Sequence, residues 1–192
     1  MNAPVLAAAF AVGLVIAIVL FVVIATYNDV VALQRRIDKA WANIDVLLKQ
    51  RHDELTKLLD TTKGYMEFER DTLTKITQAR SQYQQAVTID QKVQADQSMT
   101  SALRGFFAVA ENYPELKANT NFQMLQKRIS DLESQIADRR EFYNDCVNTF
   151  NIRIQQVPDT LVAGFMHLTP RTMLKVEEAD KADVKMAFGA AK

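Results

Sequence analysis

The hydrophobic pattern of the chain begins with an unbroken apolar run from Val5 to Ala25, and the first 28 residues carry no charged side chain. At about 1.5 Å rise per residue, a helix over this run is roughly 32 Å long, which matches a hydrocarbon core of about 30 Å. The pattern therefore predicts one transmembrane helix within an N-terminal region of residues 1–26.

A cleaved signal peptide is the alternative interpretation of this run. Such a peptide has a basic n-region, a shorter apolar core and a small-x-small cleavage site. No Lys or Arg precedes the run, and it ends Ile24-Ala25-Thr26-Tyr27 without an Ala-x-Ala motif. The sequence favours an uncleaved signal anchor.

Basic residues mark one side of the predicted span. Arg35, Arg36 and Lys39 follow it within about 15 residues, and such residues prefer the cytoplasmic side of a membrane. The single cysteine, Cys146, agrees with a reducing compartment. We expect a short N-terminal tail outside and the long C-terminal part in the cytoplasm, with the opposite orientation left open.

Apolar residues at steps of three, four or seven predict four helices in residues 27–158. The first can form one continuous rod with the span or be kinked at residues 26–29, and it ends near Gly64, a residue suited to a helix C-cap. Asp90 is the expected N-cap of the third helix, which stops before Pro114, and Pro158 ends the fourth. The four stripes are Ile37, Trp41, Ile44, Leu48, Leu55 and Leu59; Tyr65, Phe68, Leu73, Ile76, Tyr83 and Val87; Met99, Leu103, Phe106 and Ala110; Phe122, Leu125, Ile129, Leu132, Ile136, Tyr143, Val147, Phe150 and Ile154.

Stripes of this kind are typical of helices that pack nearly antiparallel. They predict an all-α fold, in which an N-terminal transmembrane helix is followed by a long antiparallel four-helix bundle with a short apolar C-terminal segment. Because successive helices alternate in direction, the chain after Pro158 should return to the bilayer.

The C-terminal region, residues 159–192, contains a short apolar segment over residues 161–168, and beyond Pro170 we expect a mobile charged tail. Eight residues cannot span a membrane, so three positions are open to the segment: the membrane interface, its own bundle, or a neighbouring subunit. We interpret it as an association element. Its candidate residues are Leu161, Val162, Phe165, Met166 and Leu168.

Two further sets of residues are candidate contact surfaces. Ala9, Gly13 and Ala17 fall four apart, and small residues at that spacing let membrane helices pair closely. This face predicts a homo-oligomer.

The second set is Trp41, Asn43 and Asp45. Three residues at steps of two cannot all be buried in one helical stripe, which makes them a candidate partner surface.

Composition and charge exclude some classes of function. The formal net charge is zero and acids alternate with bases, so we expect no nucleic-acid partner. The chain has two histidines, neither in a Glu-x-x-His or His-Glu-x-x-His motif, and it lacks the glycine motifs that bind phosphates. We expect no metal, no cofactor and no enzymatic activity, with Cys146 as a buried structural thiol. His52 and Glu54 as an acid/base pair are the remaining enzymatic alternative.

Several blocks of the sequence resemble the LemA family of bacterial membrane proteins over roughly residues 27–178. The resemblance implies a short N-terminal tail, one span and a helical bundle in the bacterial inner membrane. The matching blocks are Tyr27-Asn28, Ala40-Trp41-Ala42-Asn43-Ile44-Asp45-Val46, Arg51-His52-Asp53, Lys63-Gly64-Tyr65, Ala108-Val109-Ala110-Glu111-Asn112-Tyr113-Pro114-Glu115-Leu116-Lys117-Ala118-Asn119 and Arg140-Glu141-Phe142-Tyr143-Asn144-Asp145.

The sequence departs from the family pattern in three places. Leu55-Thr56-Lys57-Leu58 lacks a proline that members often carry, and Val157-Pro158-Asp159-Thr160 replaces Phe-Pro-Ser-Asn. Met166-His167-Leu168-Thr169-Pro170 replaces Phe-Gly-Phe-x-Pro. The contacts of the family's C-terminal region can therefore differ in this protein.

The resemblance implies a role without an established reaction. A related magnetosome-membrane protein suggests a non-enzymatic scaffold that self-assembles on membrane lipid and organises membrane or partner proteins. The genes of the family commonly lie beside those of membrane metallopeptidases, which suggests the alternative of an adaptor or regulator of such an enzyme in envelope quality control.

Overall fold

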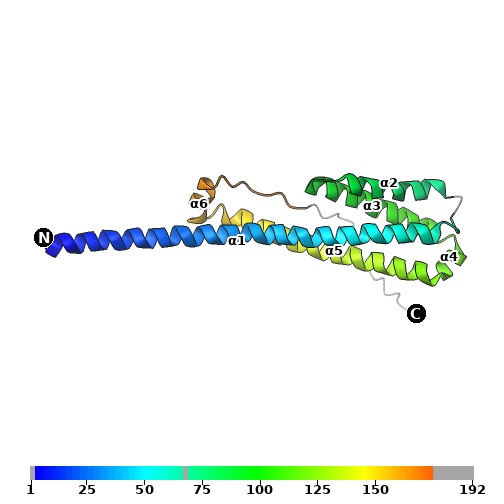
Figure 1. The fold of residues 1–192 in the computed structure, drawn as a ribbon, viewed down its shortest axis with the longest axis horizontal. Helices are drawn as coiled ribbons and strands as arrows, with labels where there is room; N and C mark the ends of the chain where they lie inside the picture. The colour runs from blue at the N-terminus through cyan, green and yellow to red at the C-terminus, as the bar shows by residue number, and fades with distance from the viewer. Residues whose placement is uncertain (1–2, 67–68, 175–192) are drawn as a thin grey trace, which may run out of the picture.

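The computed structural model describes residues 3–66 and 69–174, and within them every regular element is a helix (Figure 1). The predicted all-α fold is confirmed. The elements in chain order are α1 (Ala3–Thr62), α2 (Arg70–Gln85), α3 (Ile89–Ala110), α4 (Pro114–Ala118), α5 (Thr120–Arg153) and α6 (Asp159–Phe165).

Helix α1 is a single uninterrupted helix of 60 residues, about 90 Å long. Its N-terminal part, to Ala25, is exposed throughout and extends beyond the rest of the molecule (Figure 1). It contains an 18-residue window apolar enough to cross a membrane. The first buried side chain is that of Thr26, and the bundle begins there without a break in the helix. The predicted transmembrane helix and the first bundle helix are therefore one element.

Helix α5 runs antiparallel to α1 along most of the bundle (Figure 1). The α2–α3 hairpin packs beside these two helices at the end remote from the apolar segment, which we call the distal end. The four-helix cross-section is thus confined to the distal half. The proximal half consists of α1 and α5, covered by α6 and the residues that follow it.

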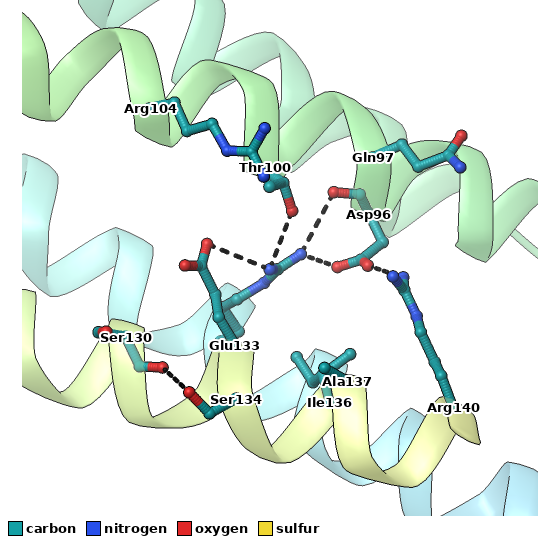
Figure 2. Close-up of a pocket in the computed structure, with 11 residues that line it drawn as sticks. Asp96, Gln97, Thr100, Arg104, Ser130, Glu133, Ser134, Ile136, Ala137 and Arg140 are labelled. Atoms are coloured by element: carbon teal, nitrogen blue, oxygen red, sulfur yellow. Dashed lines mark hydrogen bonds and ion pairs between the residues drawn. The ribbon is translucent and has the colours of Figure 1, made fainter. Parts of the chain in front are cut away.

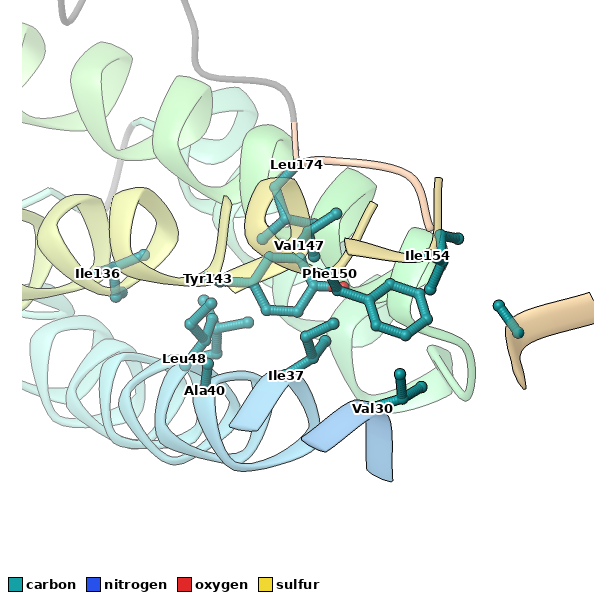
Figure 3. Close-up of a cluster of buried hydrophobic side chains, with 12 residues drawn as sticks. Val30, Ile37, Ala40, Leu48, Ile136, Tyr143, Val147, Phe150, Ile154 and Leu174 are labelled. Carbon is teal, nitrogen blue, oxygen red and sulfur yellow. The ribbon is translucent and has the colours of Figure 1, made fainter. Parts of the chain in front are cut away.

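The proximal core confirms the α1 and α5 stripes expected from the sequence. Side chains of the two helices interdigitate along one seam (Figure 3), and Ala163 and Leu174 pack against its outer side. Complete burial of an aromatic residue such as Phe150 contributes about 1.5–3 kcal/mol. The seam consists of Val30, Ile37, Ala40, Ile44 and Leu48 from α1, and Ile136, Tyr143, Val147, Phe150 and Ile154 from α5.

The start of α3 differs from the sequence prediction. Thr88, not Asp90, is the N-cap: its hydroxyl accepts a hydrogen bond from the Gln91 amide at 3.2 Å. The Gln91 side chain accepts one in return from the Thr88 amide at 3.0 Å. This reciprocal capping box satisfies two backbone donors, whereas an Asp90 cap would satisfy one.

Other helix boundaries also differ from those predicted from the sequence. Helix α2 begins at Arg70, so Tyr65 precedes it, and Phe68 lies outside the described residues. The short helix α4, which the apolar pattern did not predict, starts with Pro114 in its first turn, where proline needs no amide donor. Asn119 then caps α5 by accepting from the amides of Asn121 and Phe122.

Candidate functional site

Helix α6 lies at the proximal end of the bundle, beside the point where the apolar part of α1 ends (Figure 1). Two ion pairs fix the position of α6 along α1. Arg153 of α5 contacts Asp29 of α1 at 3.3 Å and Asp159 of α6 at 3.2 Å. Asp29 is four residues, about 6 Å of helix, beyond Ala25. The chain after Pro158 therefore returns to the end of the apolar segment, as the alternation of helices predicted.

The structure divides the candidate association residues between two faces. Val162 is 8% exposed, and Met166 and Leu168 are partly buried against the proximal core. Leu161 and Phe165 are 73% and 87% exposed. One face of α6 thus packs on its own bundle, and the other is apolar and uncovered.

Helix α6 ends at a residue in the left-handed region of backbone conformation. His167 has φ of 53°, and the Leu168 amide donates to the Ala163 carbonyl at 3.0 Å while the His167 amide donates to that of Gly164 at 3.2 Å. These bonds form a Schellman motif, whose left-handed residue is usually glycine. Here the side chain of His167 occupies a backbone conformation that costs it about 1–2 kcal/mol.

Residues 171–174, which we call the C-terminal segment, are held on α5 by two asparagines. Asn144 exchanges two hydrogen bonds with the backbone of Leu174, at 2.8 and 2.9 Å. Asn151 does the same with Arg171, both at 2.8 Å. The expectation of a mobile tail directly after Pro170 is therefore wrong for these residues, and the rest of that predicted tail lies outside the described residues.

The two asparagines match the geometry of an extended chain. Seven residues of helix rise about 10.5 Å, and three residues of extended chain cover about 10 Å. Asn144 and Asn151 are seven apart, and the residues they bind are three apart. Sequence reasoning missed this site, although two amides seven residues apart along the helix with the longest apolar stripe were an available signal.

A second missed feature is a buried polar cluster between α1, α3 and α5, formed by Arg51, Asp96, Thr100, Glu133 and Arg140 (Figure 2). Arg51 is 2% exposed; its guanidinium pairs with the Asp96 carboxylate and donates to the Thr100 hydroxyl at 3.1 Å and the Asp96 carbonyl at 3.2 Å. Arg140 pairs with the same carboxylate. One acid thereby joins cations from two other helices.

Burial lowers the pKa of Arg51 to about 10, which leaves the guanidinium charged at neutral pH. The cluster borders a cavity of about 300 Å³, also lined by Arg104, Ser130 and Ser134. Three arginines face two carboxylates there, and each of the five has an interaction partner. The arrangement is suited to fixing the register of α3 on the α1–α5 pair.

The structure does not join His52 and Glu54 as an acid/base pair. His52 packs on Tyr83 with ring centroids 5.2 Å apart, and burial lowers its pKa. The Glu54 carboxylate pairs with Lys57 and Arg128, both at 3.0 Å. The two side chains lie in separate environments. No group of three or more metal-ligating side chains gathers within the described ranges.

The candidate partner surface is also dispersed. Trp41 packs edge-on against Tyr143 at 6.2 Å, and Asp45 pairs with Lys92 of α3 at 2.5 Å. Asn43 is exposed and lines a groove of about 510 Å³ between α1 and α5.

The remaining lining of that groove is partly basic. It includes Arg36, Lys39 and Arg139 around the exposed Phe142. Cys146 also lines the groove; it is partly buried, not fully buried as expected, and this burial raises the pKa of the thiol. In the apolar part of α1, Ala9, Gly13 and Ala17 are all exposed.

These features define a membrane-associated protein with one apolar helix that continues into a helical bundle. The chain belongs to the LemA family, whose sequence profile matches residues 40–188. It is 30% identical over 173 residues to Protein LemA of Metamycoplasma hominis, a match that covers 89% of this chain and 78% of that protein. Proteins of this family are not known as enzymes.

Two magnetosome proteins share a shorter region with the chain. MamQ 1 and MamQ 2 of Paramagnetospirillum magneticum are each 34% identical to it over 64 residues. The match covers 33% of this chain and 24% of either protein, so the similarity is confined to a part of both.

Proposed function

We propose that this protein is a non-enzymatic, membrane-anchored scaffold that self-assembles and organises the membrane or partner proteins around it. The observation that carries the proposal is the continuity of α1, which joins an exposed apolar segment to the bundle without a hinge. Because a continuous helix transmits orientation, association of the apolar segments would also align the bundles. Membrane lipid and further copies of this chain are then its first partners.

The small-residue face supports self-assembly within the membrane. A Cβ atom added at Gly13 would meet no atom within 4 Å of its own protomer, so the face is open to a second helix. Ala9 and Ala17 lie one turn to either side. Helices with such a face approach closely and pack through backbone contacts.

The placement of charges supports the bacterial inner membrane with the bundle in the cytoplasm. Arg35, Arg36 and Lys39 are exposed just beyond the apolar segment, and no basic residue precedes it. This asymmetry is the one that places flanking residues on the cytoplasmic side. Labelling of an introduced Val87→Cys in intact cells with a membrane-impermeant reagent tests the orientation.

The test of self-assembly is the mass of the intact protein in mild detergent, measured by light scattering and electron microscopy. We expect a discrete homo-oligomer that Gly13→Leu reduces in size. Ala11→Leu is the matched control, because position 11 lies on the opposite face of the helix. A monomer of the unchanged protein, or equal effects of the two substitutions, would refute self-assembly through this face.

An adaptor for a membrane enzyme, such as a metallopeptidase, is the second candidate function. The observation that favours it is the groove beside Asn43, whose lining combines three basic residues, Arg36, Lys39 and Arg139, with one acid, Asp145, and the exposed apolar Phe142. Such a surface suits a partner helix with acidic and apolar residues. Co-purification of a peptidase that Arg139→Glu abolishes, while the mass of the oligomer is unchanged, would favour this function.

A further inference from the structure

We propose that the exposed face of α6, formed by Leu161 and Phe165, inserts into the interfacial layer of the same bilayer that α1 crosses, together with Val157 just before the helix. The bundle would then touch the membrane at two points, the transmembrane helix and α6. This inference rests on the membrane anchoring in the proposed function, but not on self-assembly.

The level of α6 along α1 is the first argument. Thr26 is the first buried residue of α1, so the rest of the bundle begins to cover α1 one residue after the apolar run ends at Ala25. The ion-pair chain through Arg153 fixes α6 at the height of Asp29. That height is about 6 Å outside the end of the run, within the headgroup layer of about 5–8 Å that separates the hydrocarbon core from water on each side.

The register of the exposed face is the second argument. Leu161 and Phe165 are four residues apart, so they lie on one side of α6, and they are 73% and 87% exposed. Val157, which precedes the helix, is 80% exposed. Val162 and Ala163 hold the opposite side of α6 on the bundle. An apolar face that is both uncovered and rigidly mounted marks an interaction site.

The charges around α6 identify lipid as the occupant. Those nearest to it are paired within the protein: Arg153 with Asp29 and Asp159, and Arg171 with Asp38 at 3.1 Å. The exposed face therefore offers apolar contact without a basic cluster. It also lies beside the end of the apolar part of α1 (Figure 1), where Tyr27, 46% exposed, occupies the position of an interfacial aromatic residue. Neutral phosphatidylcholine should suffice for this contact, since Arg153 and Arg171 are already paired with carboxylates of the protein.

The test measures the depth of spin labels on the full chain in phosphatidylcholine vesicles. In a Cys146→Ala background, single labels are placed through Phe165→Cys, Leu161→Cys, Val87→Cys and Val15→Cys. Accessibility to oxygen, which concentrates in lipid, is compared with accessibility to a water-soluble nickel chelate. Val87 is the matched control because its exposed fraction, 85%, is nearly that of Phe165, whereas it lies at the α2–α3 turn.

We expect the labels at positions 161 and 165 to lie about 5–10 Å below the headgroups, and the label at position 87 to be fully aqueous. Equal chelate accessibility at positions 165 and 87, with the label at position 15 in lipid, would overturn the inference and leave the anchor intact. A label at position 15 that is itself aqueous would overturn the anchor as well. Dipolar broadening at position 165 without oxygen exposure would show a second copy as the occupant, which also overturns the inference.

Discussion

Replacement of Asp96 by asparagine should destabilise the bundle more than any other isosteric change at a charged residue of the described chain. The carboxylate is 2% exposed and pairs with both Arg51 and Arg140. Asp96→Asn keeps the volume but leaves two guanidinium groups facing a neutral amide. A charge-assisted hydrogen bond contributes about 1.5–3 kcal/mol, and breaking a buried ion pair costs about 3–5 kcal/mol. We expect a loss of about 4 kcal/mol, a large share of the 5–15 kcal/mol that stabilises a typical domain.

Urea unfolding of the full chain in mild detergent measures this loss, with Trp41 fluorescence as the signal because its ring packs on Tyr143. With a slope of about 2 kcal/mol per molar urea, the midpoint should fall by about 2 M. Asp60→Asn is the control: Asp60 pairs with Lys63 at 2.7 Å on the surface, and such a pair contributes at most about 1 kcal/mol. A loss for Asp96→Asn no larger than that of the control would refute the structural role of the cluster.

Two further substitutions test the proximal end of the bundle. His167→Gly should raise the free energy of unfolding by about 0.5–1 kcal/mol, because glycine adopts φ of 53° without a Cβ clash. His167→Ala should bring no gain. A lower thermal midpoint for the glycine variant would contradict the Schellman assignment. Asn144→Asp removes the donor that the Leu174 carbonyl needs, so amide hydrogen exchange in residues 171–174 should accelerate. Asn148→Asp, at an exposed position of the same helix, should leave that exchange unchanged. Equal exchange in the two asparagine variants would show that the C-terminal segment is held by other contacts.

The long helices could be predicted from the sequence because their signals are local. The apolar run and the stripes of α1 and α5 repeat over many turns, and most residues of those stripes lie in the proximal core or in the second, distal core. Helix ends were less predictable, since caps compete within a few residues. Thr88 prevailed over Asp90 because the Gln91 side chain was placed to return the bond.

The candidate sites were harder to predict because their residue types are ordinary in helices. Arg51 and Asp96 are 45 positions apart, and each has the appearance of a solvated charge until α3 packs on α1. Asn144 bonds to backbone atoms, which leave no trace in a side-chain pattern. The apolar segment at residues 161–168 is evident from the sequence, but its division into a buried and an exposed face depends on how α6 docks.

The unbroken course of α1 gives the molecule the mechanics of a lever. From Thr26 to Thr62 the helix extends about 55 Å beyond the apolar segment. Membrane helices tilt by about 0–40° as the bilayer thins or thickens around them, and a change of about 10° would displace the distal tip sideways by roughly 10 Å. A change in bilayer thickness would thereby change the position of the distal tip, which a protein bound there can sense, with no conformational change inside the bundle.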